Sequence, residues 1–192
     1  SNSGTRASAV IVVNGVTTNL FTNQLLNAAP EFDGTGRIGR LTPSSTSVFA
    51  GKVTSFKITQ GEVNVHFPLS EGSGTKVYDV SGNGNHGTGI SMTSSSDEEG
   101  AVGRAQVFDG TTDYINCGAD ASLNITERLT LCAWINMDSA VGIYEAIISK
   151  ERGDEAGYWL LYGGSFDQVL FEFYQGDWIK APIPYPDTYA GT

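Results

Sequence analysis

Positive charge is scarce in this chain. Its 192 residues include 11 Lys and Arg against 21 Asp and Glu, which gives a formal net charge of −10. The cations stand singly, as at Arg37, Arg40 and Lys52. A protein that binds DNA or RNA needs clusters of cations to replace the counterions on phosphates. The sequence therefore argues against nucleic acid as a partner.

Cysteines and long apolar runs are scarce as well. Cys117 and Cys132 are too few for the disulfide framework of a small secreted domain, and their apolar surroundings predict buried free thiols. No run approaches the ~18 apolar residues of a membrane-spanning helix, so we expect no membrane span. Ser1–Ser8 does not have the apolar centre of a secretory signal. Export stays open, because a mature or trimmed chain has already lost such a signal.

Short strand patterns dominate what is present, and no helical period is sustained. Val48–Ile58 and Val63–Leu69 alternate apolar and polar residues around a turn at Thr59–Glu62, which predicts a β-hairpin. Thr22–Ala29 fits a short helical turn. Further strands are expected at 9–13, around Ile38, and at 107–108, 114–117, 129–137, 146–149, 158–162, 169–174 and 178–180. This pattern predicts an all-β fold, an antiparallel β-sandwich or jelly roll.

The order of motifs over Val65–Tyr162 resembles one family. The segments are EGSG from Glu71, YDVSGNGNHG from Tyr78, FDGTTDY from Phe108, TLCAW from Thr130 and IISK from Ile147. This succession resembles the laminin-G-like and pentraxin-like modules of the concanavalin A-like lectin/glucanase superfamily. The resemblance implies a jelly roll of two antiparallel sheets. Trp134, in the middle of its strand, is expected to be a core anchor.

Residues 1–60 resemble the later half of the same family. The matching segments are VVNG at 12–15, RIG at 37–39 and FAGKVTSFKI at 49–58. The chain thus looks rotated, with 1–60 as the C-terminal half of a sandwich and 61–192 as the N-terminal part of the same or a second one. It could be a circular permutant, a piece cut across two modules, or halves completed by other copies or neighbouring modules. The family's W-H-A strand is missing, which favours a piece of a longer protein.

The resemblance also implies a calcium ion near the YDVSGNGN loop. Ca²⁺ prefers about six to eight oxygen ligands, and the candidate ligands here are Asp79, Asn83 and Asn85. The acidic residue that the family often adds on its last strand is absent from Val53–Phe56. An Asx-rich turn without a metal is an equal alternative.

Catalytic and ligand-binding residues are few. Glu31-Phe32-Asp33 begins the carboxylate pattern of glucanases on this fold, but Gly36 stands where the last Glu is needed, so we expect no enzyme. Sugars stack on exposed aromatic faces. Trp178 is the preferred ligand-binding candidate, with Asp177 and Tyr174 beside it.

The resemblance and these residues together predict a non-catalytic recognition module that binds a glycan or a cell-surface receptor. The first alternative is a structural or decoration module of a virion or fibre, and the second is a glycoside hydrolase. The join between the two segments resembles phage tail or head appendage proteins. That likeness implies host attachment at a virion surface or another extracellular location, with avidity from repeated copies.

Overall fold

The structure is a computed structural model that describes most of the chain. The described residues are 6–13, 16–25, 34–71, 74–92, 98–100, 103–125, 128–138, 142–151, 157–163, 168–174 and 178–184. Nearly every described element is a strand, and no described helix is long and apolar enough to cross a membrane.

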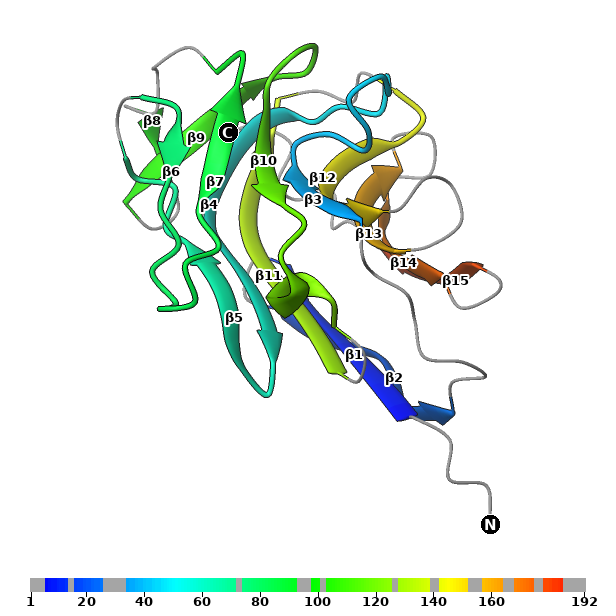
Figure 1. Cartoon of the computed structure of the whole chain (residues 1–192). Coiled ribbons are helices and arrows are strands. Elements are labelled where there is room, and N and C mark those ends of the chain that lie inside the picture. The colour runs from blue at the N-terminus through cyan, green and yellow to red at the C-terminus, as the bar shows by residue number, and fades with distance from the viewer. Residues whose placement is uncertain are drawn as a thin grey trace.

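Within the described residues, fifteen strands and one short 3₁₀ helix, η1, follow one another (Figure 1). They are β1 Arg6–Val13, β2 Val16–Leu25, β3 Thr35–Ile38, β4 Ala50–Gln60, β5 Glu62–Phe67, β6 Lys76–Val77, β7 Gly87–Ile90, β8 Glu98–Glu99, β9 Arg104–Asp109, β10 Tyr114–Gly118, η1 Ala121–Leu123, β11 Arg128–Met137, β12 Glu145–Glu151, β13 Gly157–Gly163, β14 Gln168–Tyr174 and β15 Trp178–Pro184.

The strands form two sheets, so the predicted all-β sandwich is confirmed. The seven-stranded sheet has the order β2-β1-β11-β4-β9-β8, and β5 also pairs with β4. The eight-stranded sheet has the order β15-β14-β13-β12-β3-β10-β7-β6. The described pairs are antiparallel except β1 with β11, which is parallel.

Strand β4 organises the seven-stranded sheet. One of its edges pairs with β11, while the other pairs first with β9 and then with β5. The change of partner falls at Ser55, which has a positive φ of 50° and donates its N–H to the carbonyl of Pro68 at 3.2 Å. The predicted hairpin is present, with β4 and β5 turning at Gly61.

Strands from residues 1–60 and strands from residues 61–192 lie in the same two sheets. Strand β3 lies between β10 and β12, and β4 lies between β11 and β9. Residues 35–60 therefore pair with strands of the following segment within one chain. Whether the order arose by permutation or by cutting a longer protein stays a prediction.

Two expectations are corrected. Thr22–Leu25 lies in β2, paired with β1, and not in a helical turn; pairing of β-branched residues outweighs a weak helical pattern, and 26–29 lies outside the described residues. Trp134 is half-buried and is no core anchor, because the alternating residues of β11 on the other face pack on the core, namely Leu129, Leu131, Ala133, Ile135 and Met137.

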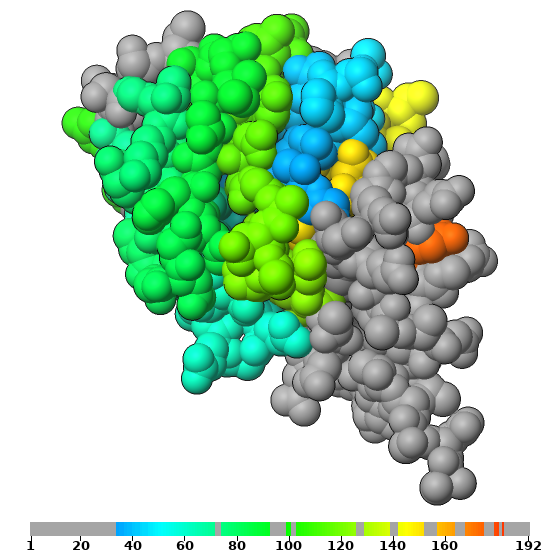
Figure 2. All heavy atoms as spheres, viewed as in Figure 1, coloured from blue at the N-terminus to red at the C-terminus, as the bar shows by residue number. Residues whose placement is uncertain are grey.

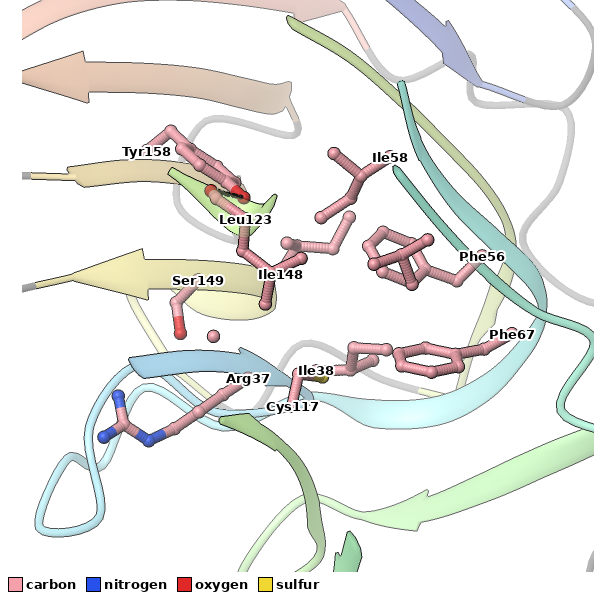
Figure 3. Close-up of a pocket in the computed structure, with 12 residues that line it drawn as sticks. Arg37, Ile38, Phe56, Ile58, Phe67, Cys117, Leu123, Ile148, Ser149 and Tyr158 are labelled. Carbon is pink, nitrogen blue, oxygen red and sulfur yellow. Dashed lines mark hydrogen bonds between the residues drawn. The ribbon is translucent and has the colours of Figure 1, made fainter. Parts of the chain in front are cut away.

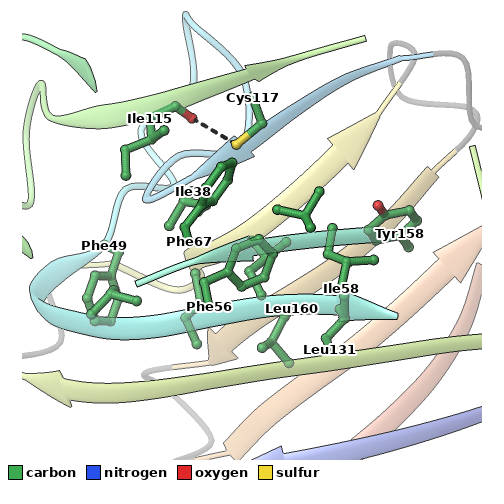
Figure 4. Packing of buried hydrophobic residues seen from close by; sticks show 14 of the residues in the cluster. Ile38, Phe49, Phe56, Ile58, Phe67, Ile115, Cys117, Leu131, Tyr158 and Leu160 are labelled. Carbon is green, nitrogen blue, oxygen red and sulfur yellow. Dashed lines mark hydrogen bonds between the residues drawn. The ribbon is translucent and has the colours of Figure 1, made fainter. Parts of the chain in front are cut away.

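Strand alternation fills the space between the sheets. In the eight-stranded sheet, Ile115, Ile38, Ile148, Leu160 and Phe171 are cross-strand neighbours, and all are buried. They meet apolar side chains of the other sheet, including Phe56, Phe67 and Leu131 (Figure 4). Each such side chain contributes roughly 1.5–3 kcal/mol by leaving water, so this layer supplies the main drive for folding.

Substitution by alanine should change the free energy of unfolding in opposite directions at Gly36 and Gly39, which lie three residues apart. A Cβ on Gly36 would lie 3.4 Å from Cys117 Cβ, an ordinary contact, whereas a Cβ on Gly39, at φ +88°, would lie 2.5 Å from the Phe108 ring. Gly36→Ala should raise the free energy of unfolding by about 0.5 kcal/mol, because the unfolded chain loses freedom. Gly39→Ala should lower it by about 2 kcal/mol. Urea denaturation checks both values, and equal effects would contradict the backbone argument.

Candidate functional site

The carboxylate of Asp79 is the centre of the predicted calcium loop. Its Oδ1 accepts hydrogen bonds from the backbone N–H of His66 and of Ser81, both at 2.9 Å. Its Oδ2 accepts from the Ser81 hydroxyl at 2.8 Å and from the N–H of Asn85 at 3.0 Å. Burial raises the pKa of Asp79, but these hydrogen bonds lower it more, so the pKa lies below its ordinary value.

The neighbouring amides bind the same strand edge. The side-chain amides of Asn83 and Asn85 both donate to the carbonyl of Asn64 at 3.0 Å, and the Ser81 hydroxyl lies 3.2 Å from the same carbonyl. Together with the bond from His66 to Asp79, these contacts occupy the edge of β5 that faces away from β4. The loop thus caps a strand edge that would otherwise be open to another strand.

The loop was predicted to bind calcium, and its donor set can be compared with that chemistry. Ca²⁺ needs oxygens that converge on one point. Here the carboxylate of Asp79 is taken up by N–H and O–H donors, and Asn85 Oδ1 accepts from the Ser122 hydroxyl at 2.9 Å. Within the described part of the chain, no group of three or more His, Cys, Asp or Glu could hold a metal. In this arrangement the oxygens of Asp79 and Asn85 are engaged by protein donors, and calcium binding itself stays a prediction.

A polar row crosses the outer face of the eight-stranded sheet. Cross-strand pairing joins Lys76, Thr88, Asn116, Arg37, Ser149, Trp159, Glu172 and Lys180, one residue from each strand. We call these eight residues the outer row. It alternates with the apolar row described above, and Figure 3 shows Arg37 extending away from Phe56 and Phe67 of the core. Figure 2 shows the part of this face formed by β7, β10 and β3.

The middle of the outer row is partly buried. Ser149 is 1% exposed and Glu172 is 2% exposed, while Trp159 between them is half-buried. Glu172 forms a 3.0 Å ion pair with the exposed Lys180, and Arg37 forms a 3.5 Å ion pair with Glu151. Trp159 also packs against a small apolar cluster on this face, formed by Ala146, Leu161 and Leu170 with Leu41 and Tyr144.

The predicted ligand-binding residues are placed only in part. Tyr174 is half-buried at the end of β14, and the strand register sets it opposite Trp178. Trp178 is described by its backbone at the start of β15, and Asp177 lies outside the described residues, as does the Glu31-Phe32-Asp33 segment. The structure therefore brings Tyr174 and Trp178 together in register and does not test their role.

One interior cavity among the described residues is too small to be a ligand site. This cavity between the sheets is lined by Phe56, Phe67, Leu123, Tyr158 and others (Figure 3). Its volume of about 10 Å³ is at the lower limit for one water molecule, so it holds no organic ligand.

The outer row was missed in the sequence although part of its signal was present. Glu172 stands between Phe171 and Phe173, which indicates a strand with one polar face. Neither the order of the strands nor their register can be read from spacing, and these decide which residues become neighbours. His66 lies in β5, and His86 Nδ1 accepts a hydrogen bond from the N–H of Asp79 at 3.1 Å. Both cysteines are free thiols; Cys117 is buried as expected, whereas Cys132 is half-buried.

Comparison of the chain with protein-family models, with characterised proteins and with solved structures gives no match.

Removing the Asp79 carboxylate should destabilise the protein by about 3 kcal/mol, because the backbone N–H groups of His66, Ser81 and Asn85 lose an ionised acceptor. Asn83→Ala, at an exposed position of the same loop, should cost about 1 kcal/mol. A carboxyl with a lowered pKa stabilises above its ordinary pKa and loses that effect as pH falls. The difference in the free energy of unfolding between the wild type and Asp79→Ala should therefore become smaller as the pH is lowered from about 6 to about 3. Urea denaturation measures it, and a difference that is constant with pH would contradict this role.

Chelation tests the calcium prediction separately. Because the loop satisfies its polar groups internally, we expect the melting temperature to be the same with EDTA and with millimolar Ca²⁺. A ligand that binds the native state must raise the melting temperature. A rise with Ca²⁺ that disappears in Asp79→Ala would show that the loop rearranges around the ion.

Proposed function

We propose that this protein is a non-catalytic recognition module that binds a glycan, with the outer row as its binding surface. The observation that supports the proposal is the register of Ser149, Trp159 and Glu172, which sets an aromatic ring between a hydroxyl and a carboxylate. Ligand sites commonly combine one aromatic surface with a few polar groups that fix orientation. Trp offers a large apolar face with a polar N–H, which suits a ring carrying hydroxyl groups.

The burial of polar groups on this face supports the same proposal. An ion pair that is removed from water is often no more stabilising than apolar residues of similar size. The pair Arg37–Glu151, in which both side chains are buried, is therefore weakly explained by stability alone. Real proteins tend to retain such costly polar groups at functional sites. We propose the setting that the family resemblance implies, an extracellular or virion surface at which the module attaches to a host.

A structural or assembly module is the second candidate. Strand β2 is ten residues long and ends the seven-stranded sheet, with no outer neighbour among the described strands. An edge of this length can accept a further strand from another copy or module. Light scattering that shows a monomer at high concentration, together with glycan binding, would favour recognition over assembly.

Substitution of the aromatic centre tests the glycan proposal. Trp159→Ala should weaken binding of a glycan identified on an array by up to about tenfold, because one stacked ring contributes about 0.5–1.5 kcal/mol. Trp134→Ala is the matched control, since Trp134 is also half-buried but lies in the other sheet. Calorimetry gives both dissociation constants. No array signal for the wild type, or equal losses in the two variants, would refute the proposed surface.

A further inference from the structure

Two carboxyl groups with unequal surroundings meet in the turn between β9 and β10. The carboxylate of Asp109 accepts hydrogen bonds from the N–H groups of Thr111, Thr112 and Asp113 at 2.8, 2.8 and 3.0 Å, and from both threonine hydroxyls. Asp113 is 7% exposed, and its carboxyl accepts the N–H of Asp109 at 3.2 Å. Asp109 is therefore well solvated by donors as an anion, whereas a charge on Asp113 would be buried beside it.

The charged groups around this turn come from several elements. The Arg40 guanidinium lies 5.7 Å from the centre of the Tyr114 ring and donates to the carbonyl of Thr111 at 3.3 Å. Strand β4 contributes Lys52, opposite Val107, and β11 is followed by Asp138, whose N–H donates to the carbonyl of Ala50. Asp109, however, is the nearest charge in sequence and is hydrogen-bonded to Asp113 in both directions.

Arg40 connects this turn to the loop formed by residues 40–47. Its Nε donates to the carbonyl of Thr42 and its Nη2 to that of Ser45, both at 3.0 Å. The same side chain reaches Thr111 in the turn. The loop is closed at its base by pairing of Arg40 with Val48. One guanidinium therefore holds the loop in shape and fastens it to the 109–113 turn, and both lie at the same end of the sandwich (Figure 1).

The other side of loop 40–47 is fastened to the outer row. The Ser149 hydroxyl lies within hydrogen-bond distance of the carbonyls of Arg40 and Leu41, at 2.8 and 3.0 Å. Arg37 also donates to the carbonyl of Leu41 at 3.1 Å. The Leu41 side chain packs on the apolar cluster that includes Trp159. The loop therefore bridges the carboxyl turn and the centre of the outer row.

We propose that the 109–113 turn, Arg40 and loop 40–47 form a pH-sensitive latch on the outer row, closed when Asp113 is protonated and looser when it has released its proton to water. In the closed form, a neutral Asp113 faces the carboxylate of Asp109. In the ionised form, the buried Asp113 anion lies beside the exposed Asp109 carboxylate, with which it exchanges backbone hydrogen bonds, and the two charges repel each other in the turn that Arg40 fastens. The effect on ligand binding rests on the proposed function, but the latch itself does not.

The direction of the pH effect follows from the Asp113 carboxyl. Burial and the negative charge of Asp109 raise the pKa of Asp113 to about 6. The closed state therefore binds a proton more tightly than an open state in which the pKa is ordinary. The stabilisation is fully present below the ordinary pKa of about 4 and is lost as pH rises through about 6. Burial raises the pKa of Asp109, but hydrogen bonds led by that of Thr111 lower it more, so Asp109 is ionised throughout this range.

Hydrogen–deuterium exchange on the ligand-free protein tests the latch. Protection factors of amides in 40–47 and 109–113, corrected for intrinsic rates, should fall about tenfold or more between about pH 5 and about pH 7.5. Asp113→Asn retains an acceptor for the Asp109 N–H but carries no charge, so its protection should not change with pH. Glu62→Gln, which removes an exposed carboxyl in β5, should behave like the wild type.

Two results would overturn the latch: equal protection at both pH values in the wild type, or the same pH dependence in Asp113→Asn. If Asp113→Asn does not fold, NMR titration of the wild type gives the answer. The Asp113 carboxyl and the amides of 40–47 should then titrate together near pH 6, and a midpoint near 4 would contradict the proposal. Because no ligand is present, a positive result here with no glycan binding would refute the proposed function and leave the latch intact.

Discussion

Every strand of the eight-stranded sheet has to bury one face against the other sheet, and the rest of the structure depends on this constraint. Successive side chains of a strand point to opposite faces. Register therefore sorts whole rows of residues at once: the row through Ile38 and Ile148 enters the core, and the row through Arg37 and Ser149 is left on the outside. A slip of one residue in a strand would exchange its two faces, and in β3 it would place the charge of Arg37 between the sheets.

The sheet edges impose the second constraint, because unpaired N–H and C=O groups invite other strands. The protein uses several solutions. Strands β6 and β8 have only two residues each. Strand β15 contains Pro182 and Pro184, which have no N–H to offer. The edge of β5 is covered by the Asp79 loop, so a motif with the composition of a metal site works here as an edge cap. The same hydrogen bonds explain why the loop is rich in Asp, Asn, Ser and Gly.

The sequence was informative where a signal is local. Alternation predicted the β4–β5 hairpin, the strands from β9 to β15 and the all-β class, because period and turn residues lie within a few positions. It failed for β2, in which pairing with β1 overrides a weak helical pattern, and for β7, a Gly87–Ile90 strand hidden in a glycine-rich stretch. The outer row could not be predicted at all. Its members come from eight strands whose order is a property of the fold and not of any one segment.

The loop after β3 shows how local chemistry and global topology combine. Arg40 reaches a turn 71 residues away, and Ser149 reaches the carbonyl of Arg40 across 109 residues. These contacts exist because β3 is inserted between β10 and β12, which brings its following loop beside both. A loop held by a few hydrogen bonds at two points opens more readily than the strands beneath it. Loop 40–47 therefore opens more readily than the strands beneath it and lies against the polar outer face, while the register that creates this face is fixed by the core.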